Sequence, residues 1–244
     1  ADGTFKSFTN GKPLKKININ HPGELYNFIK DHPMAYGYNN RPHKFIRDEF
    51  PNTLDSNHEF HEMFLDIETR SEFGFPKPEL AQEEVTMIQL YDNKLKKYII
   101  LGRKEFTGVF EQTGVEYLCI PDEKKLLNTF MDILSKLNPT VIKTFNGLLF
   151  DFPYLTNRIK ILGLDYNRLS PVRDVKFLDE VMTQDGMTGV GVSWEGLYLV
   201  DLRENFLKYA YAGLANNGLG NVSNYYGFEG KIDHSEFDSF DGQY

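Results

Sequence analysis

Within the stretch HEMFLDIETRSEFG, residues 61–74, two acidic residues stand inside an apolar run. They are Asp66 and Glu68, two positions apart. Because side chains alternate across a β-strand, both carboxylates leave the same face of the predicted strand. Like charges side by side raise each other's pKa and cost folding free energy unless a cation lies between them, and a divalent metal is the usual cation. This pair therefore predicts a metal site on a strand.

A third carboxylate, Asp151, lies in a second stretch, TFNGLLFDFPYLTNR, at residues 144–158. A predicted strand ends at Asn146-Gly147, and Asp151 stands where a predicted helix begins, a position at which the helix dipole stabilises negative charge. If the two strands are neighbours, the three carboxylates share one site. No His or Cys is close to them in the sequence, so oxygen ligands favour Mg²⁺ or Mn²⁺ over Zn²⁺. Such sites commonly hold two ions about 3.5 to 4 Å apart.

The elements that would position these carboxylates follow from the apolar pattern. Apolar runs bounded by turn residues predict strands, with a hairpin turn at Asp92-Asn93. Apolar residues at helical spacing between an N-cap, Asp122, and a stop, Pro139, predict a helix. Pro153 suits the first turn of a second helix. The sequence predicts a strand at 62–69, a hairpin of two strands at 85–92 and 96–102, and a short strand at 115–121. A helix at 122–139, a strand at 140–147 and a second helix at 150–163 follow.

The flanking segments are less regular. Residues 1–60 are polar, rich in Asn and broken by proline, with one short helix predicted at 21–31. Beyond residue 165 the runs LSPVRDVKF and VSWEGLYLVDL and a predicted helix, LRENFLKYAYAG, follow without a clear repeat, and the Gly- and Asn-rich GLANNGLGN interrupts them. We therefore expect a lead-in at 1–60 and one main domain at 61–244.

Composition narrows the class of protein. The chain has 244 residues, of which 41% are hydrophobic and 25% charged, as in ordinary globular proteins. It shows neither an apolar run near the roughly 20 residues that cross a bilayer nor a signal sequence, so no membrane association is expected. The single Cys119 lies in an apolar run and is expected to be a buried, inert thiol, which fits a reducing cytoplasm. A net charge of -8 argues against non-specific coating of nucleic acid, but not against a nuclease with an acidic site.

FLDIET followed by FNGLLFDFPYLTNR resembles the first and second exonuclease motifs of the proofreading domain in family B DNA polymerases, especially those of the T-even phage type. The likeness continues through LSPV and YLVDLRENFLKY and, more weakly, through GLGNVSNYYGFEGK, so it covers residues 63–232. Residues before 60 resemble the tail of the polymerase amino-terminal domain only loosely. The resemblance implies an α/β fold of the RNase H-like (DnaQ-like) type, a mixed sheet flanked by helices. It also implies a DEDD-group 3′–5′ exonuclease that releases deoxynucleoside monophosphates from single-stranded DNA.

The resemblance further implies roles for individual residues. The three carboxylates become ligands of two Mg²⁺ or Mn²⁺ ions, with Asp66 bridging both. The implied substrate contacts are Asn146 near the scissile phosphate, a ring of Phe150 or Phe152 against a base, and Lys231 on the DNA backbone. The alternatives are an Asn-Gly turn, packing rings and a solvated lysine. Exposed positions on the rim of a strand are the alternative for Asp66 and Glu68. A solvated helix face is expected for Arg158 and Lys160.

The family's third motif, Tyr-x-x-x-Asp, supplies a fourth carboxylate, and this sequence shows no match to it. Tyr225 and Tyr226 have Glu229 and Gly230 four residues later, and His234 and Asp238 are one residue short of the spacing of the histidine variant. We expect either a fragment or a split gene whose second polypeptide completes the domain.

The expected partners are a single-stranded DNA 3′ end or a primer–template, and the remaining polymerase polypeptide with its palm, fingers and thumb. The expected location is the cytoplasm, that of an infected bacterium if a phage encodes the chain. Two other functions stay open. A non-catalytic exonuclease-like subunit that docks a polymerase fragment is favoured by the missing third motif. A free-standing nuclease is disfavoured by the polymerase-like residues after 165.

Overall fold

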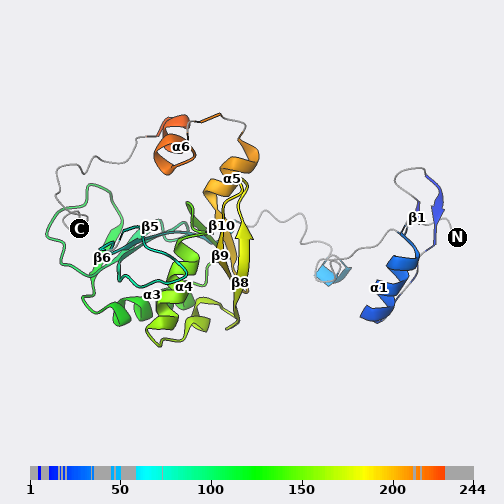
Figure 1. Cartoon of the computed structure of the whole chain (residues 1–244), viewed down its shortest axis with the longest axis horizontal. Coiled ribbons are helices and arrows are strands. Elements are labelled where there is room, and N and C mark those ends of the chain that lie inside the picture. Colours follow the sequence, from blue (N-terminus) through cyan, green and yellow to red (C-terminus); the bar gives the residue numbers. More distant parts are fainter. Residues whose placement is uncertain are drawn as a thin grey trace. The chain divides into compact units, whose positions relative to one another are not determined.

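The structure is a computed structural model, and it describes residues 5–6, 11–15, 17, 19, 21–33, 35, 45–46, 48–50, 59–72, 74–210, 213–214 and 216–228 (Figure 1). The chain divides into two compact units, Ala1–His58 and Glu59–Tyr244. None of the helices in the described ranges is long and apolar enough to cross a membrane.

The first unit contains a short helix and a two-stranded ribbon. Helix α1 spans Pro22–Asp31, where the sequence predicts a helix, and the ring of its N-cap His21 accepts a hydrogen bond from the amide of Gly23 at 3.2 Å. Proline in the first turn supports this start because the amide it lacks has no partner within a helix. Strand β1, Phe5–Lys6, pairs antiparallel with β2, Pro13–Leu14.

The second unit is built on a six-stranded mixed sheet with the strand order β10-β7-β3-β4-β5-β6. β3 lies parallel to β7 and antiparallel to β4, and β10 and β6 add parallel edges. The mixed sheet with helices confirms the predicted α/β fold class. The strands are β3 Glu62–Thr69, β4 Val85–Asp92, β5 Lys97–Gly102, β6 Val115–Cys119, β7 Val141–Thr144 and β10 Tyr198–Asp201.

The interior strand β3 has two different faces. Its odd-numbered residues are buried, among them Met63, Leu65 and Ile67, each at most 4% exposed. They join one core cluster with residues of α3 and α4 such as Phe130 and Leu155. The even-numbered residues face the other way and include both predicted ligands of this strand. The alternation therefore places apolar side chains in the core and carboxylates outside it.

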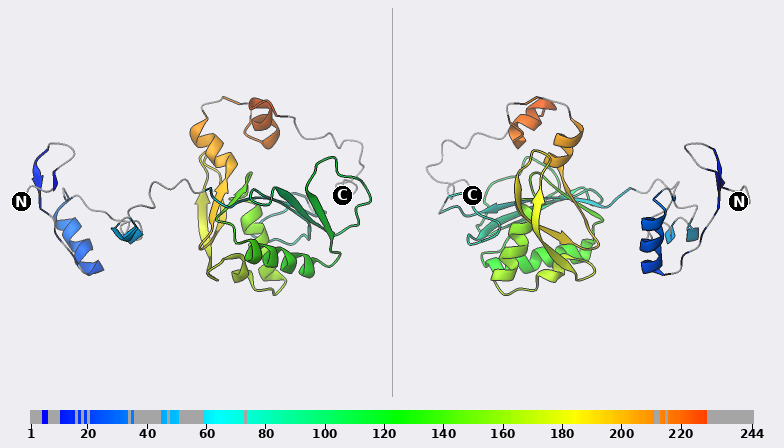
Figure 2. Two further views of the ribbon diagram at one scale, coloured as in Figure 1. Left: turned by 180° about the vertical axis from the view of Figure 1, so that it is seen from behind. Right: turned by 45° about the vertical axis from the view of Figure 1, so that its right-hand side comes forward.

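Two helices lie on one side of this sheet (Figures 1 and 2). Helix α3, Glu123–Leu137, begins after Asp122, whose side chain accepts a hydrogen bond from the amide of Lys125 at 2.7 Å, so the predicted N-cap is confirmed. It ends at Asn138, in the left-handed conformation. Helix α4 spans Asp151–Ile161, and the turn η2, Tyr166–Leu169, follows it.

Two further strands and two further helices of this unit lie around the six-stranded sheet. Strands β8, Val175–Met182, and β9, Thr188–Trp194, form a separate antiparallel hairpin. Helices α5, Leu202–Tyr209, and α6, Leu219–Tyr225, lie on the side of the sheet away from α3 and α4 (Figure 2). Their contact is aromatic, because Phe206 of α5 meets Tyr225 and Tyr226 at ring-centroid distances of 5.7 and 6.0 Å.

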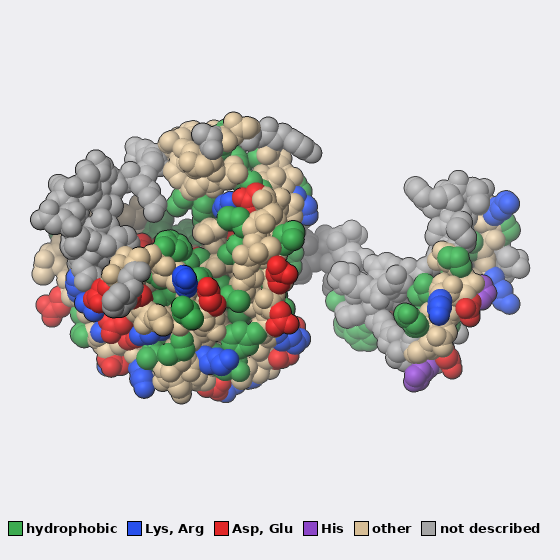
Figure 3. All heavy atoms as spheres, in the orientation of Figure 1, with side chains coloured by type: hydrophobic (Ala, Val, Ile, Leu, Met, Phe, Trp, Pro, Cys, Tyr) green, Lys and Arg blue, Asp and Glu red, His purple; other side chains and the backbone are tan. Residues whose placement is uncertain are grey.

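Two expectations about surface exposure in this unit, those for Cys119 and Arg158, are wrong. Cys119 is exposed, because β6 is an edge strand and the cysteine lies at its end. Arg158, expected on a solvated helix face, is only 8% exposed because Glu123 of α3 neutralises it in the interior. In Figure 3, Lys and Arg side chains lie among Asp and Glu side chains over the face of this unit that is shown.

Candidate metal-dependent nuclease site

The first two candidate ligands lie side by side on β3. Asp66 is directly opposite Gln89 and Glu68 opposite Met87 in the antiparallel pairing with β4. Asp66 is exposed and Glu68 half-buried, so both carboxylates are open to solvent on the face away from the core. The antiparallel ladder with β4 holds the backbone beneath both residues, whereas the pairing of β3 with β7 ends at Phe64. A paired strand gives the rigid support that a metal site requires.

Asp151 reaches this strand from the first turn of α4. Its carboxylate oxygen Oδ1 accepts a hydrogen bond at 3.2 Å from the amide of Ile67, which lies between Asp66 and Glu68 in the strand. The side chain is only 3% exposed. Burial is the main cause that raises the pKa of Asp151 to about 8, and the negative charges of Asp66 and Asp201 raise it further. The site therefore holds a carboxyl group that is costly to ionise without a cation.

Asp201 is a site residue that the sequence analysis did not single out. It ends β10, is 8% exposed, and accepts hydrogen bonds from the amides of Asn146 at 2.9 Å and Leu148 at 3.0 Å. It also accepts from the amide of Arg203 at 2.9 Å as the N-cap of α5. Asp201 thus holds the turn that leads from β7 to α4. An Asp before a helical run is an N-cap signal, so LVDLREN in the sequence contained the clue.

The turn between β7 and α4 has a special backbone. Asn146 has φ of +68°, which matches the alternative interpretation of an Asn-Gly turn. At Gly147 an added Cβ would lie 2.0 Å from Oγ1 of Thr144, so no other residue fits without movement. This sharp turn brings the chain from the end of β7 to Asp151 within a few residues.

The two phenylalanines that flank Asp151 have different surroundings. Phe150 is half-buried, and its ring lies 5.3 Å from that of Phe75, which is 79% exposed, and 5.4 Å from Tyr154. Phe152 is 1% exposed and meets the core residue Trp194 edge-on at 5.3 Å. The expected substrate contact is therefore wrong for Phe152, which is a packing residue. Phe75 is a further ring at this site that the motifs of the sequence did not point to.

The donor set suits a hard divalent cation. Asp151 is buried and feels the negative charges of Asp66 and Asp201, so it is the kind of group that a cation stabilises. In the described part of the chain no three acidic, His or Cys side chains are gathered closely enough to hold an ion as they stand. Lys231, the remaining predicted contact, lies outside the described residues.

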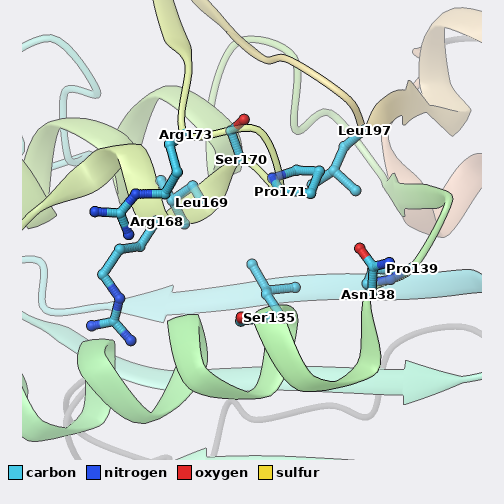
Figure 4. A pocket seen from close by; sticks show the side chains of 10 residues that line it. Ser135, Asn138, Pro139, Arg168, Leu169, Ser170, Pro171, Arg173 and Leu197 are labelled. Carbon is cyan, nitrogen blue, oxygen red and sulfur yellow. The ribbon is translucent and has the colours of Figure 1, made fainter.

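A hollow elsewhere in the unit has no link with these carboxylates. It has a volume of about 160 Å³ and lies between the end of α3 and the segment that follows α4 (Figure 4). Two arginines at its rim already have acidic partners, Arg168 with Asp132 and Arg173 with Asp165, both at 2.5 Å. None of Asp66, Glu68 and Asp151 lines it.

Comparison with known proteins identifies the family. The family described as "DNA polymerase family B, exonuclease domain" matches residues 36–219, three quarters of the chain. The chain belongs to this family and is an exonuclease domain of the kind found in family B DNA polymerases.

Its relatives come from phages, archaea and eukaryotes. The chain is 26% identical over 188 residues to the DNA-directed DNA polymerase of Escherichia phage RB69, which covers 66% of this chain and 20% of the relative. It is 26% identical over 176 residues to the DNA polymerase of Thermococcus gorgonarius, covering 68% and 21%. It is 52% identical over 81 residues to the catalytic subunit of DNA polymerase epsilon from Saccharomyces cerevisiae, covering 33% and 3%. The chain thus spans about a fifth or less of the length of these relatives.

Proposed function

We propose that this chain is the proofreading part of a family B DNA polymerase and removes nucleotides from single-stranded DNA 3′ ends. One observation supports it most directly. The buried carboxyl of Asp151 reaches β3 between Asp66 and Glu68, so charges that repel one another converge where a divalent cation would stabilise them.

In the proposed mechanism, Asp66, Glu68 and Asp151 hold two Mg²⁺ or Mn²⁺ ions. Bound there, the ions would activate a water molecule and neutralise the charge that develops on the phosphate. The chain itself positions the DNA. Phe75 and Phe150 offer neighbouring rings beside Asp151 on which an unpaired base can stack. Asn146, at the turn before α4, is the proposed contact to the strand near the scissile phosphate.

Selectivity for mispaired ends would come from the cost of unpairing. A terminal nucleotide must leave its partner to reach the carboxylates, and a mismatched end leaves at a lower cost. The polymerising activity, with palm, fingers and thumb, belongs in this proposal to polypeptide that these residues do not include. The matched segment makes up only about a fifth of the length of these relatives, which supports such a partner.

The test combines metal binding with DNA cleavage. Binding of Mn²⁺ is measured by calorimetry or electron paramagnetic resonance, and hydrolysis by release of mononucleotides from a single-stranded oligonucleotide. Asp66→Ala should abolish both. Asp132→Ala is the matched control, because Asp132 is a surface carboxylate paired with Arg168 and should leave both unchanged. Binding and cleavage that survive Asp66→Ala would contradict the proposal.

The missing third motif makes the isolated chain a special case. We expect it to cleave DNA weakly, because one ligand of the second ion is absent, and we expect a longer polypeptide with the downstream reading frame to restore the activity. Inactivity of that longer polypeptide would favour the second candidate, a non-catalytic docking role. The observation that favours this non-catalytic role is that the described residues contain no cluster of three metal-ligating side chains.

A further inference from the structure

The segment between β3 and β4, residues 70–84, is held to the rest of the unit by hydrogen bonds from side chains of α4. We call it the β3–β4 loop. It begins two residues after Glu68 and carries Phe75. Apart from residue 73, the structure describes all of it. Connecting segments are usually the mobile parts of a domain, so the contacts that hold this one bear on the site beside it.

One face of α4 binds the backbone of this loop. The hydroxyl of Tyr154 donates to the carbonyl of Glu83 at 2.7 Å, and the side-chain amide of Asn157 donates to the carbonyl of Pro78 at 2.9 Å. Residues three and four apart share a helix face, so Arg158 lies beside them. All three side chains donate to carbonyl groups, which fix backbone position whatever the side chains of the loop.

Arg158 adds the deepest of these contacts. It donates to the carbonyls of Ala81 at 3.2 Å and Gln82 at 2.8 Å. Its other nitrogens donate to Glu123 of α3 at 2.8 and 2.7 Å, and Glu123 also accepts from the amide of Val85 at the start of β4. The bidentate pair fixes the orientation of the guanidinium. The far end of the loop is therefore held to both helices.

The near end carries Phe75, whose ring lies against Phe150 at the start of the same helix. Phe75 is 79% exposed, so little packing other than this contact determines where its ring lies. Its position depends on the backbone of the loop, and the backbone depends on α4. Phe150 and Tyr154 are one turn apart on α4 and also touch, at 5.4 Å.

We propose that Tyr154 and Asn157 are positioning residues for DNA binding, which hold the β3–β4 loop so that Phe75 stays beside Phe150 at the carboxylate site. This inference rests on the proposed exonuclease function. A ring held in its bound position needs no ordering when a base arrives. The hydrogen bonds of Tyr154 and Asn157 therefore raise the affinity for DNA although neither residue contacts it. The two residues act through Phe75, and their effect should vanish when that ring is removed.

The experiment uses Asn157→Ala and Tyr154→Phe in the full chain. Each removes one hydrogen bond to the loop, and Tyr154→Phe keeps the buried ring. Asn128→Ala is the matched control, because the side-chain amide of Asn128 donates to the carbonyl of Lys124 in its own helix and accepts from Arg168 of η2, and neither partner belongs to the β3–β4 loop. Two quantities are measured: hydrogen exchange of the amides in residues 74–84, and the Kd for a fluorescent single-stranded oligothymidine. The global unfolding midpoint in urea is recorded as well.

We expect loop amides to exchange about tenfold faster and DNA to bind about three- to tenfold more weakly in both variants, a range that corresponds to the loss of one ordinary hydrogen bond. Asn128→Ala should change neither quantity. In a Phe75→Ala background, which itself weakens binding, Asn157→Ala should have no further effect on the Kd but should still speed up exchange. This non-additivity separates positioning from a general loss of stability.

Three results would overturn the inference. Unchanged loop exchange would show that the bonds do not hold the loop. Faster exchange with an unchanged Kd would show that the position of the loop does not matter for DNA. Additive effects of Asn157→Ala and Phe75→Ala would show that Asn157 acts by another route. If the unsubstituted chain binds no DNA, the proposed function itself fails and the inference with it, which is a different outcome from normal binding that the variants leave unchanged.

Discussion

Asp151 and Asp201 are both buried aspartates, but the surroundings disfavour a negative charge on Asp151 and supply hydrogen-bond donors to Asp201. Asp151 accepts a hydrogen bond from the amide of Ile67 and has two negatively charged neighbours, and burial raises its pKa to about 8. Asp201 accepts three backbone hydrogen bonds, with partners for both of its oxygens. The backbone satisfies both oxygens of Asp201, whereas Asp151 keeps an unfavourable charge that a cation would stabilise.

This contrast predicts that an Asp→Asn substitution raises the free energy of unfolding at Asp151 and lowers it at Asp201. A carboxyl whose folded-state pKa is raised binds a proton more tightly when folded, so its ionisation removes stability as the pH rises from about 4 to about 8. Asp151→Asn keeps an acceptor for Ile67 and removes that cost. At pH 9, without divalent metal, we expect it to raise the free energy of unfolding by ~1–2 kcal/mol, with little change at pH 4.

Asp201→Asn is the comparison. It replaces one carboxylate oxygen by a donor that faces an amide, and we expect a loss of about 1–3 kcal/mol. Urea unfolding in the presence of a chelator measures both variants. Destabilisation by Asp151→Asn at pH 9 would show that the charge of this carboxylate is compensated within the chain.

Among the elements, one buried ion pair joins α3 to α4. Arg158 and Glu123 are both at most 8% exposed and meet through two hydrogen bonds. Arg158→Met keeps much of the side-chain volume but leaves Glu123 without its cation. Removing one member of a buried pair costs about 3–5 kcal/mol.

The double substitution Glu123→Leu with Arg158→Met serves as the control, since it removes both charges. It should recover much of that loss, because well-packed apolar residues often replace a buried pair without cost. Thermal unfolding compares the three chains. Equal destabilisation by the single and the double change would assign the cost to the carbonyl groups of the β3–β4 loop rather than to the charge of Glu123.

The sequence allowed prediction of elements whose signals are local. β3 and β4 follow from their apolar residues, and α3 from its spacing and from Asp122. The β8–β9 hairpin was missed because β8 is largely exposed and β9 contains glycines, so neither alternates clearly. Helix α6 was missed because it is short and lies in a stretch rich in Gly and Asn. Such elements depend on packing rather than on local preference.

The residues of the candidate site also divide into those with a local sequence signal and those whose surroundings depend on packing. Asp66, Glu68 and Asp151 could be selected because acidic residues in apolar runs are conspicuous in a sequence. The burial of Phe152 and Arg158 could not be predicted from the periodicity of α4, where nearly every position of the first two turns is buried. Arg158 was expected at the surface because charged residues usually are, and only the position of Glu123 on another helix makes its burial stable.

For the whole molecule, the division between His58 and Glu59 predicts that the second unit folds alone. A chain that begins at residue 59 should keep a single cooperative unfolding transition with a midpoint within about 3 °C of the full chain, because its core is complete. Calorimetry provides the measurement. A chain that begins at residue 71 lacks the interior strand β3 and should not fold. A large loss of stability on removing residues 1–58 would contradict the division into two units. In that case residues 36–58 would be restored first, because the family match starts at residue 36.

The exposed Cys119 also makes the chain convenient for chemical labelling. It is the single cysteine of the sequence, it lies on the edge strand β6, and its Sγ is 4.0 Å from the carbonyl oxygen of Arg103. A maleimide dye would attach there alone, without any substitution. Two strands, β4 and β5, separate that position from β3, so the dye would leave the carboxylates accessible. Energy transfer from Cys119 to a dye on the 3′ nucleotide of an oligonucleotide would then report the arrival of DNA in the unmodified sequence, while the same thiol requires a reductant in storage to prevent dimers linked by a disulfide.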